Sequence, residues 1–97
     1  MAIAILLDVP GVTAAQYDRA CELITGGKGL KSLADWPVPG ILAHIATVTP
    51  TGFRVVDVWE SEAAFQAFGA VLGPALKEVG FPDVAPQVLP AYKFIKS

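Results

Sequence analysis

The sequence predicts an α+β fold of the ferredoxin-like type, with a βαββαβ order of elements and an antiparallel sheet. Apolar runs of strand length and two amphipathic segments follow one another in that order, and 97 residues suit one domain, 1–97. Only 16% of the residues are charged, against roughly 25% in typical domains. Because helices cover one face of such a sheet, we expect a second copy of the chain to cover the other, giving a homodimer.

The first strand and the first helix have clear boundary signals. Ala2–Leu7 is a short apolar run followed by a Pro-Gly turn, which favours a buried strand. Thr13 and Gln16 fit a capping box at the start of a helix over residues 13–25, which a Gly-Gly pair ends. One face of this helix is apolar and, on the simplest interpretation, structural; it holds Tyr17, Ala20, Cys21 and Ile24.

Residues 26–40 form a long connection, and connections of this length are often functional or mobile. Leu30, Leu33 and Trp36 predict that the segment folds back onto the body of the domain. We expect a short helical turn within it, over Leu30–Ala34.

A hairpin follows this connection. Ile41–Thr49 and Phe53–Glu60 are apolar and rich in β-formers, and Pro50, Thr51 and Gly52 supply the turn. If Thr49 and Gly52 flank a two-residue loop, the register pairs His44 with Asp57 and Leu42 with Trp59.

This register places His44, Asp57, Trp59 and Leu42 on one face of the sheet, because side chains alternate along a strand. The opposite face is smaller and mostly apolar, with Ile41, Ala43, Ile45, Val56, Val58 and Glu60. We assign that second face to the helices, so the face of His44 is expected to be the open one.

Ser61 is a favourable N-cap for a second helix. Its apolar face holds Phe65, Phe68, Leu72, Leu76 and Val79. Because proline lacks an amide N–H and clashes with the preceding turn, Pro74 predicts a helix to about Leu72, a break at Gly73, and a second piece that Gly80 ends.

The last strand is expected within Gln87–Lys96, after a loop over Pro82–Pro86. Pro90 interrupts it, and proline in sheets is confined to edges, bulges and strand starts. The strand therefore lies at an edge, or crosses at Pro90 from one partner to another.

His44 and Asp57 are the candidate catalytic residues. Directly opposed strand residues lie about 5 Å apart at Cβ, so the two side chains can touch. A carboxylate beside an imidazole fixes its tautomer, and such a pair can act as a general base in an enclosed cavity. The alternative is a satisfied polar pair with a structural role alone.

Five further residues are candidates for ligand contact, each with a structural alternative. Trp59 and Leu42 either hold a ligand or pack in the core and the dimer interface. Trp36 either contacts a ligand or closes the long loop onto the body. Asp8 either reaches the mouth of the cavity or caps the end of its strand, and Phe94 lines either the cavity or the dimer seam.

Composition excludes several partners and cofactors. The seven basic residues are scattered and the net charge is −2, so neither nucleic acid nor an anionic membrane surface has an electrostatic site. No apolar run approaches the roughly 20 residues of a membrane span, and no signal peptide is expected, which makes the cytoplasm the default location.

A single cysteine and a single histidine form neither an internal disulfide nor a zinc cluster within one chain, and no phosphate-binding loop is present. We expect no metal and no cofactor.

The stretch from Phe53 to Phe65, above all Trp59-Glu-Ser-Glu-Ala-Ala-Phe65, resembles the strand-to-helix segment of the antibiotic-biosynthesis-monooxygenase-like proteins. These belong to the dimeric α/β barrel superfamily, and the order of elements extends the resemblance loosely over the whole chain. The resemblance implies a homodimer with two facing sheets, and a pocket between each sheet and its helices or beneath the barrel rim.

Members include cofactor-free monooxygenases, haem-degrading enzymes, isomerases of small aromatic catabolites and proteins without a known activity. The resemblance is nearest to a branch of small proteins for which it implies no reaction. Haem-degrading relatives use a histidine on the second helix as iron ligand, and residues 61–79 contain none, which disfavours haem.

The sequence therefore predicts a small-molecule-binding protein, with a cofactor-free monooxygenase-like or isomerase-like reaction on a small apolar or aromatic substrate. His44 would be the base, and in an oxygenation the substrate anion itself would activate dioxygen. The alternative is a non-catalytic ligand-binding module or a purely structural homodimer. A cavity beside His44 distinguishes a pocket from a filled interior.

Overall fold

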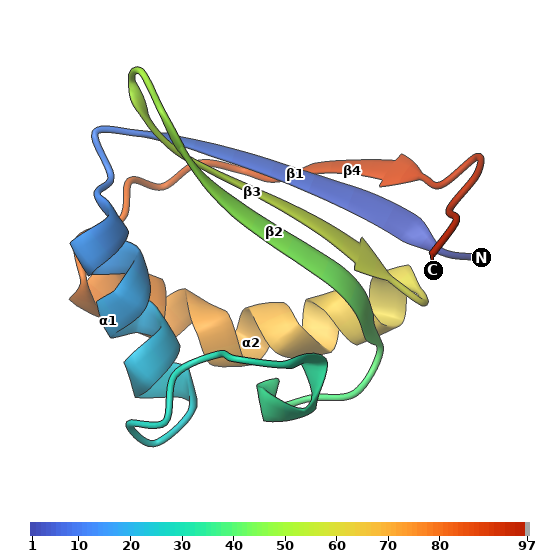
Figure 1. Ribbon diagram of the computed structural model, residues 1–97, viewed down its shortest axis with the longest axis horizontal. Coiled ribbons are helices and arrows are strands. Elements are labelled where there is room, and N and C mark those ends of the chain that lie inside the picture. Colours follow the sequence, from blue (N-terminus) through green and yellow to red (C-terminus); the bar gives the residue numbers. More distant parts are fainter. Residues whose placement is uncertain (97) are drawn as a thin grey trace.

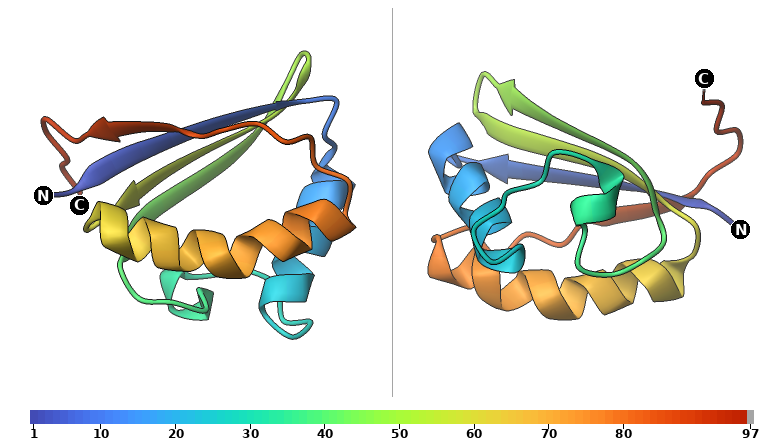
Figure 2. Two further views of the ribbon diagram at one scale, coloured as in Figure 1. Left: turned by 180° about the vertical axis from the view of Figure 1, so that it is seen from behind. Right: turned by 60° about the horizontal axis from the view of Figure 1, so that its bottom comes forward.

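The computed structural model describes residues 1–96 and has the expected order of elements (Figure 1). They are β1 (Ile3–Pro10), α1 (Ala14–Ile24), a short 3-10 helix η1 (Leu33–Asp35), β2 (Ile41–Thr49), β3 (Gly52–Trp59), α2 (Glu62–Glu78) and β4 (Gln87–Pro90). The strands form one antiparallel sheet in the order β2-β3-β1-β4. Both helices and the loop that carries η1 lie on the same side of the sheet (Figures 1 and 2). The predicted α+β, ferredoxin-like fold is confirmed.

The capping box of α1 is confirmed. The backbone N–H of Gln16 donates to Thr13 Oγ1 at 3.2 Å, and the backbone N–H of Thr13 donates to Gln16 Oε1 at 2.9 Å. Because both partners lie within one turn, this helix start is fixed by local sequence alone.

The first strand is longer than the predicted run Ala2–Leu7 and continues through Pro10. Its last residues pair with β3, with Asp8 opposite Arg54 and Val9 opposite Phe53. The turn comes one residue later, at Gly11, whose φ of 77° favours glycine. The pairing with a distant strand therefore extends β1 into residues that the local pattern assigned to a turn.

The predicted break at Gly73 is wrong, because α2 runs unbroken through Pro74. Ser61 caps it as expected, with its Oγ accepting the Ala64 N–H at 3.1 Å. Pro74 costs one backbone hydrogen bond, but the preceding residue is Gly73, which has no Cβ to crowd the ring. Continuation of the helix keeps Ala75 buried on the same side as Phe68, and this packing outweighs the local preference.

The hairpin register is confirmed from Ala43 to Thr49, including the pair His44–Asp57. It fails at the first residues of β2, where an irregularity between Ile41 and Ala43 pairs Ile41 with Trp59. The bulge places Ile41 in the core and leaves Leu42 half-buried. The predicted pairing of Leu42 with Trp59 is therefore wrong.

The assignment of the two sheet faces was inverted. The helices cover the face of His44, Asp57 and Trp59, while Ile45 on the other face is 56% exposed. The Trp59 ring stacks on Phe68 of α2 at a centroid distance of 5.2 Å. Both faces are apolar in sequence, and the larger aromatic volume decides which of them packs against the helices.

The last strand is shorter than the predicted Gln87–Lys96 and lies at the sheet edge, as expected from Pro90. Beyond Pro90, the Ala91 N–H donates to the Ala2 carbonyl at 2.9 Å, after which the chain leaves β1. Tyr92 is fully exposed in this segment. Because Pro90 has no N–H to donate, it suits this edge position.

We expect Gly52→Ala to destabilise the domain by about 1–3 kcal/mol, the range for overpacking. A Cβ at Gly52 would lie 2.3 Å from the Val9 carbonyl oxygen and 2.9 Å from the Pro10 Cα, and this backbone cannot yield without disturbing the sheet. The matched control is Gly69→Ala, where a Cβ meets nothing within 4 Å and a helical alanine is favoured. Urea unfolding of both variants checks the difference, and equal stability of the two would contradict it.

Candidate functional site

A chain of hydrogen-bonded side chains runs from the core of the sheet to α1. The Trp59 indole N–H donates to Asp57 Oδ2 at 3.2 Å, and Asp57 Oδ1 lies 2.5 Å from His44 Nδ1. His44 Nε2 lies 2.6 Å from the Tyr17 hydroxyl. Four residues from three elements thus form one connected polar chain between the sheet and the helices.

The chemistry of the partners fixes where the protons lie. Burial raises the pKa of the Tyr17 phenol above its ordinary range, so the phenol keeps its proton and can donate it to His44. With Nε2 accepting from Tyr17, neutral His44 carries its proton on Nδ1 and donates it to the Asp57 carboxylate. The arrangement has the logic of a catalytic triad, in which a hydroxyl faces a base that a carboxylate orients.

Asp57 is the sole charged residue buried among residues 1–96, with 5% of its surface exposed. It accepts a hydrogen bond on each carboxylate oxygen, from His44 and from Trp59. The two hydrogen bonds compensate the free-energy cost of burying the carboxylate. The hairpin register positions one donor, His44, and the packing of the Trp59 ring positions the other.

An apolar cavity of about 60 Å³ lies against this chain, between the sheet and the helices. Its polar edge is formed by Tyr17, His44 and Asp57. The rest of the wall comes from both helices, the long loop and the sheet, with Leu7, Ala20, Cys21, Ile24, Leu30, Trp36, Val55, Phe68, Leu72, Leu76 and Phe81. The volume is well below the roughly 300–1,000 Å³ of drug-sized ligand pockets. The hypothesis of a purely structural homodimer predicts an interior without a cavity. The structure has a small cavity at this place.

Trp36 closes the cavity from the loop side. Its ring lies edge-on to the His44 ring, with centroids 4.9 Å apart and planes 65° apart. Within residues 1–96, its indole N–H is buried without a hydrogen-bond partner. An unpaired buried donor is costly, so the packing of the ring against the core holds Trp36 in place.

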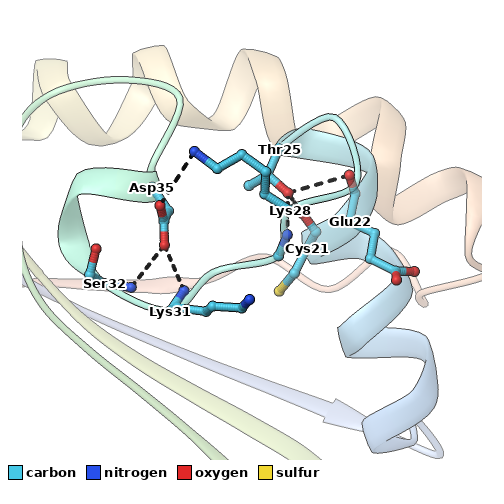
Figure 3. Close-up of polar contacts among 8 residues, drawn as sticks. Cys21, Glu22, Thr25, Lys28, Lys31, Ser32 and Asp35 are labelled. Carbon is cyan, nitrogen blue, oxygen red and sulfur yellow. Dashed lines mark hydrogen bonds and ion pairs between the residues drawn. The ribbon is translucent and has the colours of Figure 1, made fainter.

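The carboxylate of Asp35, the residue before Trp36 in the sequence, fastens the loop (Figure 3). Asp35 accepts the backbone N–H groups of Lys31 at 2.9 Å and of Ser32 at 3.0 Å, and Lys28 Nζ lies 3.8 Å from it. The N–H donors hold the pKa of the Asp35 carboxyl below its ordinary value, so the group is ionised at neutral pH. The helical turn in this loop is η1, a few residues later than the predicted Leu30–Ala34.

A shallower groove of about 300 Å³ lies outside the cavity, between the C-terminal half of α1 and residues 27–31. It shares Tyr17, Cys21 and Leu30 with the cavity. Thr25 links two lining residues of the groove, because its hydroxyl donates to the Cys21 carbonyl and accepts the Gly29 N–H, both at 2.7 Å (Figure 3). The three shared residues separate the groove from the cavity.

The structure separates the predicted ligand-contact residues. Trp36 lines the cavity, whereas Trp59 is fully buried, donates to Asp57 and is not part of the cavity wall. Asp8 lies on the bare side of the sheet, where Arg54 Nε donates to it at 2.6 Å. Leu42 and Phe94 are half-buried and are not part of the cavity wall. The alternation of β1 directs Asp8 away from the helices, and the short β4 does not carry Phe94 to the sheet.

The apolar pattern of the first helix predicts a structural role for Tyr17 and Cys21. In the structure, both residues line the cavity and the groove. Burial raises the pKa of the Cys21 thiol, which keeps it protonated and poorly reactive. Tyr17 occupies an apolar helix face, as most core tyrosines do. The signal for its role is its hydroxyl contact with His44, 27 residues along the chain.

In the part of the chain that the structure describes, His, Cys, Asp and Glu side chains do not gather in groups of three or more that could hold a metal ion. Over the same residues, neither helix is long and apolar enough to cross a membrane.

Solved structures resemble this chain over nearly its full length. One is a monooxygenase from the gene ActVA-Orf6 of Streptomyces coelicolor in complex with the ligand nanaomycin D, with 26% identity, a TM-score of 0.51, and coverage of 99% of this chain and 92% of that one. The chain has the fold of the antibiotic-biosynthesis-monooxygenase-like proteins. The resemblance noted in Trp59–Phe65 is confirmed at this level.

A second structure with this monooxygenase-like fold is SnoaB, a cofactor-independent oxygenase from Streptomyces nogalater. It shares 12% identity and a TM-score of 0.54, over 99% of this chain and 95% of that one. At this identity the likeness concerns the fold alone. No protein-family model matches the sequence, and no curated protein matches it significantly.

Proposed function

We propose that the protein is a cofactor-free, monooxygenase-like enzyme for a small apolar or aromatic substrate, with His44 as the base. The observation that carries the proposal is the hydrogen-bonded chain Tyr17–His44–Asp57 at the wall of an apolar cavity. The fold shared with a monooxygenase at 26% identity supports the choice of reaction class.

His44 acts through Tyr17 in this proposal, because its Nε2 already accepts the Tyr17 hydroxyl at 2.6 Å. The Tyr17 oxygen takes a proton from the substrate as it passes its own proton to His44. The imidazolium that forms is stabilised by the carboxylate of Asp57. The substrate anion then supplies all the electrons for dioxygen, so that one oxygen atom enters the product and the other leaves as water with two substrate hydrogens.

The groove outside Tyr17 is the proposed place of the organic substrate. At about 300 Å³ it reaches the lower end of ligand-pocket volumes, whereas the inner cavity does not. Lys28 and Lys31 line it from the loop, and Asp18 and Glu22 line it from α1. The lysine ammonium groups on the loop side can pair with a phenolate-like anion. The substrate we expect is therefore a small aromatic molecule with an acidic hydroxyl.

We further propose a homodimer through the bare sheet face, closing a dimeric α/β barrel. Ile45 is 56% exposed there, and the neighbouring Val56 and Val58 are only half-buried within one chain. Exposed apolar surface on a small domain with few charges favours association of two copies.

The test of the reaction is oxygen uptake with small phenols and hydroquinones, together with nanaomycin D as a binding probe. We expect uptake by the native protein, one atom of oxygen-18 from labelled dioxygen in the product, and a loss of about 100-fold or more in kcat for Tyr17→Phe and His44→Gln. The phenylalanine variant keeps the aromatic stacking of Tyr17 on Phe53 and removes only the hydroxyl.

The matched control is Tyr92→Phe, the same chemical change at a fully exposed position, which should leave turnover unchanged. Equal turnover of Tyr17→Phe and the native protein would sink the role of the relay. Probe binding without oxygen uptake would favour a non-catalytic carrier, and neither binding nor uptake would favour the structural homodimer.

A further inference from the structure

We propose that the cavity behind Tyr17 is a binding site for dioxygen, separate from the groove that holds the organic substrate. The choice of dioxygen among small apolar molecules rests on the proposed oxygenase function. The existence of an apolar gas site rests on the cavity itself, on its size, its walls and its position.

The size of the cavity excludes an aromatic ring. An apolar protein cavity of roughly 150 Å³ accommodates benzene or xenon, and this one measures about 60 Å³. It therefore suits an occupant of only a few atoms. A six-membered ring would require Trp36 or Leu30 to move out of the wall.

The walls exclude a stably bound water. They are aliphatic and aromatic almost throughout, and the polar groups of Tyr17, His44 and Asp57 at the edge are bonded to one another. Among the described residues, the Trp36 indole N–H is the one buried side-chain donor of the wall without a partner. A buried water needs about two to four polar partners, whereas an apolar cavity stays dry and accepts apolar molecules. Dioxygen is apolar and small, and it matches both conditions.

The cavity lies beside the groove, so dioxygen in the cavity would be close to the organic substrate in the groove. Tyr17, Cys21 and Leu30 line both the cavity and the groove, so a molecule in the cavity and one in the groove border the same three residues. Tyr17 is also the residue through which the proposed base acts. Dioxygen held here would lie next to the place where the substrate anion forms.

Gas binding can be measured on the native protein without any substrate. Under dioxygen pressure, we expect paramagnetic broadening of the methyl resonances of Leu7, Leu72 and Leu76 to exceed that of Leu33 and Val48, which are exposed away from the proposed dimer face. Xenon under pressure should occupy the same cavity in a crystal. Broadening that follows solvent exposure alone, or an ordered water in the cavity, would overturn the site.

A variant that fills the cavity gives a second measurement. Ala20 is buried in its wall, and Ala20→Val should abolish xenon binding and raise the KM for dioxygen about tenfold, with a smaller effect on the KM for the phenol. The control is Ala67→Val, the same change on the exposed side of α2. If Ala20→Val fails to fold, Leu72→Ala enlarges the cavity instead and should increase xenon occupancy.

The outcomes separate the two proposals. Gas binding in a protein that turns over no phenol leaves the site standing and overturns the oxygenase. Turnover with an unchanged KM for dioxygen in Ala20→Val and no xenon in the cavity overturns the site and leaves the oxygenase standing.

Discussion

Trp59→Ala is expected to destabilise the domain by about 3–5 kcal/mol, which approaches the whole stability of a small domain. The Trp59 side chain is completely buried, stacks on Phe68 and lies edge-on to Phe65, with centroids 6.0 Å apart. Its removal leaves a large cavity in the main core and also takes a hydrogen-bond donor from Asp57. Urea unfolding followed by circular dichroism measures the loss.

Trp36→Ala is the matched control for this prediction, because it removes the same side chain from a half-buried position. Trp36 packs against the core from the loop, and its indole N–H has no partner to lose among the described residues. We expect a clearly smaller loss of stability than for Trp59→Ala. Equal losses would show that the core is not centred on Trp59.

The second large effect concerns the buried pair in the hairpin. Asp57→Leu removes the acceptor of both His44 Nδ1–H and Trp59 Nε1–H, and each orphaned donor costs about 1–3 kcal/mol. His44→Leu in turn orphans one oxygen of Asp57 and the hydroxyl of Tyr17. Both single variants should unfold at markedly lower urea concentration than the native protein.

The double variant His44→Leu/Asp57→Leu separates pairing from packing. It leaves only the Trp59 and Tyr17 donors without partners, so its loss should be smaller than the sum of the two single losses by about 0.5–3 kcal/mol. Strict additivity of the two losses would contradict a direct interaction. The double variant should also have no oxygenase activity, since the proposed base is gone.

The sequence determined the features whose signals lie close together along the chain. Thr13 and Gln16 define a helix start within one turn, and a two-residue loop defines the hairpin register from Thr49 back to Ala43. That register alone places His44 opposite Asp57. Local geometry fixes such pairs because the turn leaves the strands no other alignment.

Tertiary packing decided whether a local signal prevailed. Pro74 predicts a helix break, yet burial of Ala75 keeps α2 continuous. The bulge near Leu42 likewise turns Ile41 toward Trp59. In both places a local preference worth a few kcal/mol opposes the burial of apolar side chains, and burial prevails.

Only the tertiary structure decided which sheet face the helices cover and what completes the site. Both faces of the hairpin carry apolar residues, so alternation identifies two faces without saying which of them packs inward. The aromatic side chains of α2 settle this choice by stacking on Trp59. The same packing brings Tyr17 of α1 onto His44, a contact between elements whose relative placement no local pattern encodes.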